Sequence, residues 1–229
     1  MSTKMFRILI AITGFIGVVA LSASFAINPA PPASLTIPQV VAWGKEHEVL
    51  IQAGAWLQAF GSLLEVIFIL AILHITGALS RFMGLIAAAS AVLIMGVSLV
   101  EVSFYLNAIA GGVSGDLATL AVSLNLIKSI QHAYVIAPAP ALLLALGGVI
   151  ITSHLFPRFL GYLGLAFGVA LGILGFIGTF IPLQQIIDDV LTAQEVWFAI
   201  LAILLALTVR KALNGSTTSE QTPVVAGNQ

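Results

Sequence analysis

The sequence predicts an all-α polytopic membrane protein, a bundle of six transmembrane helices. Of its 229 residues, 60% are hydrophobic and only 7% are charged, whereas a soluble globular domain carries about 25% charged residues. The apolar residues form long runs, each near or above the ~20 residues that cross the hydrocarbon layer. Because these runs are continuous rather than alternating with polar residues, they favour helices over the strands of a membrane barrel.

The six apolar runs occupy residues 1–213, which we expect to form one transmembrane domain. The expected spans are 6–28, 49–77, 82–109, 119–152, 159–183 and 194–212. Between the first two spans, Thr36 and Gln39 have capping-box spacing, which predicts a short helix that carries Trp43 along the membrane surface. Residues 214–229 contain few apolar side chains, so we expect a disordered cytoplasmic tail there.

Positive charge is distributed unevenly between the two ends of the predicted bundle. One end collects Lys4, Arg7, Arg81, Arg158, Arg210 and Lys211. The other end holds Lys45 and most of the acidic residues, and we expect Glu195, at the start of the last span, to lie on this outer side of the membrane. The positive-inside rule therefore predicts that both termini are cytoplasmic.

The first span has an alternative interpretation as a signal peptide. Ser24-Phe25-Ala26 is a small-x-small cleavage site behind an apolar run and two basic residues, and cleavage there would leave five helices. We favour a retained helix, because the apolar run from Ile8 to Ile27 is longer than the core of a typical signal peptide.

Three consecutive spans each carry a stripe of polar residues at helical spacing. The stripes are Gln58 and Glu65 on the second span, Ser98, Glu101 and Tyr105 on the third, and Asn125, Lys128 and His132 on the fourth. Lipid penalises such residues, so we expect the stripes to face one another as a polar core.

Within this polar core, the simplest arrangement is an ion pair between Glu101 and Lys128. We expect His132 to lie one turn from Lys128 and to extend the network together with Tyr105 and Glu65, whereas Gln131 should lie off the stripe. Pro138 and Pro140 follow and lack backbone donors, which predicts a kink in the fourth span.

The polar core supports two interpretations that the sequence leaves open. It is either a site that binds or transports a small molecule or protons, or a network that only fixes helix packing in a structural or accessory membrane protein. An intramembrane hydrolase is a distant third interpretation: Gly112 to Gly115 reads GVSG, similar to the nucleophile segment of rhomboid proteases, but the last span has no histidine to activate the serine.

Other classes of site find little support in the composition. The chain has no cysteine, and Glu46, His47 and Glu48 are adjacent rather than on one helical face, so we expect no metal site and no cofactor. A net charge of -1 gives no case for nucleic-acid binding. The expected partners are the lipid bilayer and a small-molecule ligand, and the oligomeric state is left open.

Glycines on the fifth span form a narrow stripe through Gly164, Gly168 and Gly172, flanked by Gly161 and Gly175. Small residues at four-residue spacing let another backbone approach closely. We expect packing within the chain, against the first or the last span, rather than a dimer contact.

The segment SHLFPRFLGYLGLAFGVALGILG, from Ser153 to Gly175, resembles the entry to the fifth span in a bacterial family of six-helix membrane proteins that carries only a domain-of-unknown-function label. The matching element is Pro157, Arg158, Phe159, Leu160 and Gly161. The resemblance implies six spans in a bacterial cytoplasmic membrane, and it supplies no substrate or catalytic residue. Lys128 and His132 are not part of the family pattern.

Overall fold

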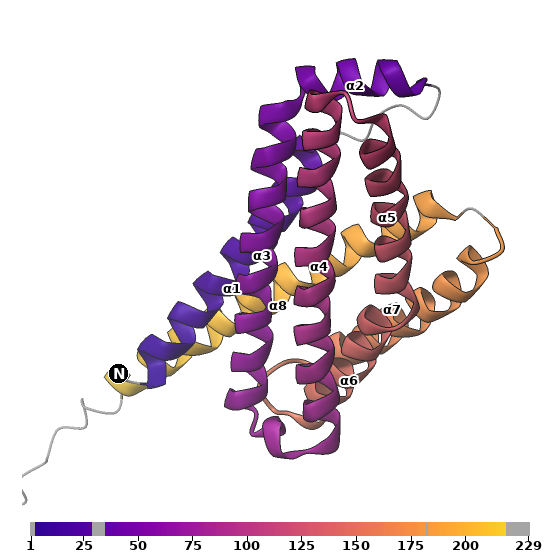
Figure 1. Cartoon of the computed structure of the whole chain (residues 1–229). Helices are drawn as coiled ribbons and strands as arrows, with labels where there is room; N and C mark the ends of the chain where they lie inside the picture. Colours follow the sequence, from indigo (N-terminus) through magenta and orange to yellow (C-terminus); the bar gives the residue numbers. More distant parts are fainter. Residues whose placement is uncertain (1–2, 29–34, 182, 219–229) are drawn as a thin grey trace, which may run out of the picture.

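The computed structural model describes residues 3–28, 35–181 and 183–218, which contain eight α-helices, one short 3₁₀ helix and no strand (Figure 1). The helices are α1 (Thr3–Ile27), α2 (Ile37–Glu46), α3 (Glu48–Ile75), η1 (Ala78–Ser80), α4 (Phe82–Ser114), α5 (Leu117–Ile136), α6 (Pro138–Thr152), α7 (Arg158–Gly178) and α8 (Gln184–Thr218). Six segments are long and apolar enough to cross a membrane: Lys4–Ile27, Glu48–Ile75, Phe82–Ser114, Leu117–Thr152, Arg158–Gly178 and Gln184–Thr208. The predicted all-α bundle is therefore confirmed.

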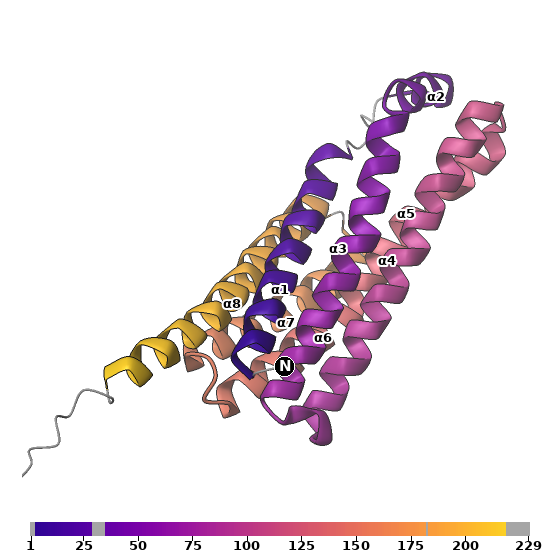
Figure 2. The ribbon, with the colours of Figure 1, turned by 90° about the vertical axis from the view of Figure 1, so that its left-hand side faces the viewer.

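The helices form an upright group crossed by an oblique one. α3, α4 and α5 stand side by side, while α1 and α8 pack together and cross behind them (Figure 1). α2 lies across the ends of α3 and α4, and the backbone amide of its N-cap residue, Thr36, donates to Oε1 of Gln39 over 2.9 Å. The amino terminus and the end of α8 point toward the same end of the bundle as the α3–α4 connection (Figure 2).

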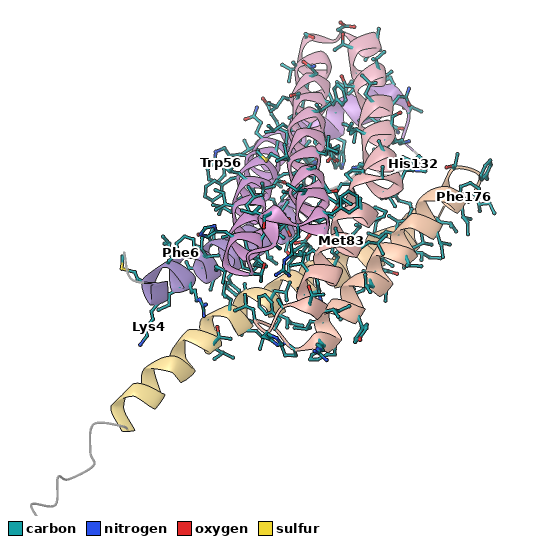
Figure 3. The ribbon with its side chains drawn as sticks, turned by 90° about the horizontal axis from the view of Figure 1, so that it is seen from below. Lys4, Phe6, Trp56, Met83, His132 and Phe176 are labelled. Carbon is teal, nitrogen blue, oxygen red and sulfur yellow. The ribbon has the colours of Figure 1, made fainter. Side chains whose placement is uncertain are left out.

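The bundle has an apolar interior and an apolar surface, as a membrane requires. Trp197 and Phe198 are fully buried, and the Trp197 indole donates to the carbonyl of Leu160 over 3.0 Å. Large apolar side chains also cover the outside: Trp56 is 63% exposed and Phe176 is 68% exposed, and both lie at the rim of the bundle (Figure 3).

The fourth predicted span is broken into two helices at Ala137. α5 ends at Ile136 and α6 begins at Pro138, and Figure 1 shows that α6 turns away from the axis of α5. Because Pro138 and Pro140 have no N–H, the carbonyls of Tyr134 and Ile136 lose the donors that a continuous helix would supply. The expected kink is thus a full break, which lets α6 and α7 pack as an oblique pair.

The glycine stripe of α7 meets α6 and α8. A Cβ added at Gly164 would stand 2.9 Å from the Trp197 ring, and one at Gly168 would stand 2.8 Å from Leu144. Gly172 is looser, because its added Cβ would come no closer than 3.8 Å to Pro140. Of the two expected neighbours, the last span is the one that the stripe contacts, through Trp197, whereas the glycines of α1 pack on α3.

Candidate functional site

A hydrogen-bonded cluster around the buried carboxylate of Glu101 joins α3, α4 and α5. We call it the carboxylate cradle, and it consists of Glu101, Gln58, Gln131 and Tyr105. The Gln58 side-chain amide donates to Oε2 of Glu101 over 2.6 Å, and the Gln131 amide donates to Oε1 over 2.7 Å. Tyr105 lies beside the same carboxylate, with its hydroxyl 3.5 Å from Oε1 and 3.4 Å from the Gln131 amide. Both oxygens of Glu101 are therefore satisfied by neutral donors, as a buried carboxylate requires.

The stripes predicted on α3 and α4 face each other. Gln58, Glu65, Ser98 and Glu101 are all buried, and Tyr105 is half-buried. Next to the cradle, the hydroxyls of Ser62 and Ser98 lie 2.8 Å apart. This pair holds the two helices in register one turn from Glu101.

The stripe predicted on α5 faces the wrong way. Asn125 and Lys128 are exposed, and neither bonds to Glu101, so the expected Glu101–Lys128 ion pair is wrong. The inward face of α5 carries Ser123, Ile127 and Gln131 instead. At 3.6 residues per turn, this face is ~100° from the predicted stripe. Gln131, which was expected off the stripe, supplies the contact.

His132 lies apart from the carboxylate cradle. It is half-buried, and its Nε2 is 3.2 Å from the hydroxyl of Thr179 at the end of α7. Figure 3 shows His132 close to that end of α7, at the edge of the bundle. His132 therefore connects α5 to α7 and is not a neighbour of Glu101.

A second polar cluster brings together side chains from α3, α5 and α8. It contains Glu65, Tyr134, Gln194 and Glu195. The Gln194 amide donates to the Tyr134 hydroxyl over 3.3 Å, and Glu65 and Glu195 are close enough to interact electrostatically. Three buried oxygens have no hydrogen-bond partner: Glu65 Oε1, Gln194 Oε1 and Glu195 Oε2. We call these four residues the paired-carboxyl cluster.

The two clusters are neighbours in the bundle. Tyr134 is within electrostatic range of Glu195, Glu65 and Glu101, and among the described residues its one side-chain hydrogen bond is the one from Gln194. Gln58, which holds Glu101, and Glu65 are seven residues apart on α3, which corresponds to ~10 Å along the helix axis. The core thus has two carboxyl levels, both within electrostatic range of Tyr134.

The sequence interpretation missed Tyr134, Gln194 and Glu195. It began the last span at residue 194, whereas α8 begins at Gln184, so Glu195 lies ~16 Å along the helix and its side chain is directed inward. The sequence did contain a pattern that indicates the earlier start of this helix: Ile187, Val190 and Leu191 have helical spacing, so the apolar face continues past the two acidic residues Asp188 and Asp189.

The predicted tail from residue 214 is helical as far as Thr218, and 219–229 lie outside the described residues.

Within the described ranges, no lysine, arginine or histidine pairs with a carboxylate of either cluster, and no group of three or more histidine, aspartate or glutamate side chains is arranged to hold a metal ion. The groups present are carboxyl, phenol and amide groups. Carboxyl and phenol groups exchange protons, and amides orient them by hydrogen bonding.

Ser114, from the segment similar to a protease nucleophile, is at the exposed end of α4. Its hydroxyl donates to the carbonyl of Gly111 over 3.2 Å. In the described part of the chain no histidine is hydrogen-bonded to Ser114, so it lacks the general base that a serine nucleophile needs.

Compared with protein-family models, with curated proteins and with solved structures, the chain matches none of them. The resemblance of residues 153–175 to a bacterial membrane-protein family therefore stays a prediction, and the functional argument rests on the geometry of the polar core.

Proposed function

We propose that the protein conducts protons across the bilayer through its polar core. The observation that carries this proposal is the paired-carboxyl cluster, in which Glu65 is buried and Glu195 is half-buried. Each has one buried oxygen without a hydrogen-bond partner, and neither pairs with a cation among the described residues. An ionised carboxylate at the bilayer centre costs roughly 2.5–3.5 kcal/mol on insertion scales. A proton is the smallest ligand that removes this cost.

The order of the groups supports a relay. Glu101, at the upper level, is held by amides, and Glu65 and Glu195 lie at the lower level, nearer the α3–α4 connection. Tyr134 interacts with carboxyl groups at both levels and is fixed by the Gln194 amide. The Glu101 carboxylate would first take up a proton from the upper end and then release it by way of the Tyr134 hydroxyl to the paired-carboxyl cluster.

We favour protons over a larger small molecule as the cargo. Two surface cavities, one beside Arg81 and one beside Phe104, are lined by no residue of either carboxyl cluster. Oxygen atoms in a packed bundle can exchange protons without an opening wide enough for an organic molecule.

Purified protein in liposomes that contain a pH-sensitive dye tests the proposal. With a potassium diffusion potential applied, wild-type protein should acidify or alkalinise the lumen faster than empty liposomes do. Glu65→Gln and Glu195→Gln should abolish this flux, whereas Asp189→Asn, which removes a charge from the exposed part of α8, should retain it. Flux that is unchanged in Glu65→Gln, or absent in the wild type, would contradict the proposal.

A second candidate, a purely structural role, is favoured by the cradle itself. Both oxygens of Glu101 are bonded to neutral donors, so this carboxylate can fix helix register without any cargo. On this alternative, Glu101→Gln lowers thermal stability while Glu65→Gln and Glu195→Gln change nothing in the flux measurement.

We place the protein in a bacterial cytoplasmic membrane with both termini inside, because the basic residues collect at the end where α1 begins. The absence of cysteine makes single-cysteine variants a clean test. Ser80→Cys should react with an impermeant maleimide only in inverted vesicles, and Ala118→Cys only in intact cells. The opposite pattern would reverse the orientation.

A further inference from the structure

A cavity of about 430 Å³ opens at the end of the bundle where α3 and α6 finish and α4 begins. This volume falls within the range of small-molecule sites. The cavity lies apart from the polar core and plays no part in the proton relay. Because three membrane-spanning helices end around it, it lies at the level of the lipid head groups.

The cavity has one charged side chain, and it is positive. Arg81 is exposed at the rim, and its guanidinium has no hydrogen bond or ion pair within the described residues. Thr76, Thr152 and Ser153 line the same space, but their hydroxyls donate to backbone carbonyls of the helices that carry them. The donors left for a ligand are those of the guanidinium, which can give two parallel hydrogen bonds to the oxygens of a phosphate.

The rest of the wall is apolar and faces lipid. Phe82 is 73% exposed and Met83 is 50% exposed, and both lie next to Arg81 at the start of α4. Figure 3 shows the Met83 side of this end of the bundle. A soluble anion would gain nothing from this apolar wall, whereas an acyl chain would pack against it.

We infer that this cavity binds an anionic phospholipid, with its phosphate on Arg81 and an acyl chain along Phe82 and Met83. Basic pockets between transmembrane helices at the cytoplasmic surface are suited to anionic head groups. The site is independent of the proposed proton relay, so either can fail without the other.

Gly148 offers a way to fill the cavity without touching its charge. It lines the cavity from α6, and a Cβ added there meets no atom within 4 Å. Gly96, on α4, is equally open but does not line the cavity. Gly148→Leu and Gly96→Leu are therefore a matched pair, since both replace a helical glycine that has space around it.

The experiment measures lipid binding by native mass spectrometry and by the thermal shift of the full chain in detergent. Dioleoyl phosphatidylglycerol should bind and raise the melting temperature, and dioleoyl phosphatidylcholine should do neither. Arg81→Gln should weaken phosphatidylglycerol binding roughly tenfold, the effect of losing one charge-assisted hydrogen bond. Arg158→Gln removes a charge at the same end without lining the cavity and should change binding less than about twofold.

Gly148→Leu should also weaken phosphatidylglycerol binding, and Gly96→Leu should not. Equal losses in Arg81→Gln and Arg158→Gln would overturn the inference, because they would indicate attraction by the surface as a whole. A shift of the same size with glycerol 3-phosphate would overturn it too, since the occupant would then be a soluble anion. Circular dichroism of each variant confirms that a loss of binding is not a loss of fold.

Discussion

The side-chain amide of Gln131 donates to Oε1 of Glu101 across 2.7 Å and so joins α5 to α4 inside the bundle. One turn earlier on α5, Lys128 is exposed and takes no part. The buried carboxylate is therefore stabilised by neutral hydrogen-bond donors rather than by a counter-charge. With neutral donors, no second ion has to be removed from water. The free-energy cost of desolvating such an ion often exceeds the electrostatic gain from forming a buried ion pair.

Gln131→Leu should destabilise the protein, and Lys128→Leu should not. The first change removes a hydrogen bond to a carboxylate, which is worth about 1.5–3 kcal/mol. The second replaces an exposed side chain, where effects usually stay within about 0.5 kcal/mol. Thermal unfolding in detergent, followed by circular dichroism, measures both. A larger loss for Lys128→Leu would favour the ion pair that the sequence predicted.

Hydrophobic carbodiimide should modify Glu65 or Glu195 before Glu101. The reagent enters from lipid and needs a free carboxyl oxygen, which Glu65 and Glu195 have and Glu101 lacks. Digestion and mass spectrometry locate the adduct. Glu65→Gln and Glu195→Gln together should abolish rapid labelling, and rapid modification of Glu101 would show that its hydrogen bonds do not hold in the membrane.

Gly161→Ala should destabilise the protein, while Gly172→Ala should be neutral or stabilising. A Cβ at Gly161 would stand 2.7 Å from the carbonyl oxygen of Gly147 and 2.9 Å from the backbone nitrogen of Ile151. Backbone atoms of α6 cannot move aside cheaply, so a cost of about 1–3 kcal/mol is expected. At Gly172 the nearest atom is 3.8 Å away, and alanine gains up to about 1 kcal/mol in helix propensity. The difference in melting temperature between these variants measures the α6–α7 contact, and equal melting temperatures would contradict it.

The spans could be read from the sequence because crossing a membrane requires length and apolar content, and both are local properties. The rotation of each helix about its axis is not local. On α5 the stripe with the most polar residues does not face inward, because long side chains such as Lys128 can reach the head groups and a glutamine is enough to satisfy Glu101. Packing of Ile127 and Ser123 decides the rotation, and it depends on neighbours that the sequence does not name.

Glu195 was misplaced for a related reason. Two exposed aspartates, Asp188 and Asp189, interrupt the apolar run, so the span was expected to begin after them. In the structure, the Gln184 amide donates to Asp188 over 2.8 Å on the outer face of α8 while Ile187 is buried. A helix can present carboxylates on one face and continue into the membrane on the other, and mean hydropathy does not distinguish the two faces.

Asp116 should make the stability of the α4–α5 connection dependent on pH. Gly115 ends α4 in the left-handed conformation, with φ of 78°, and Asp116 then caps α5 by accepting from the Thr119 amide at 3.1 Å and from its hydroxyl at 2.6 Å. These bonds, the Thr119 hydroxyl above all, favour the charged form and lower the pKa of Asp116 below its ordinary value of 3.8.

Because the folded pKa is the lower one, the stabilisation is fully present above the unfolded value and is lost as the pH falls through the folded value. Asp116→Ala should therefore lower the melting temperature near neutral pH, and its deficit should shrink as the pH falls below the ordinary aspartate pKa of 3.8. Asp116→Asn keeps a cap oxygen but no charge, so its smaller deficit isolates the electrostatic part of the capping interaction. A deficit for Asp116→Ala that stays constant as the pH falls would mean that the hydrogen-bonding geometry, and not the charge, provides the stabilisation.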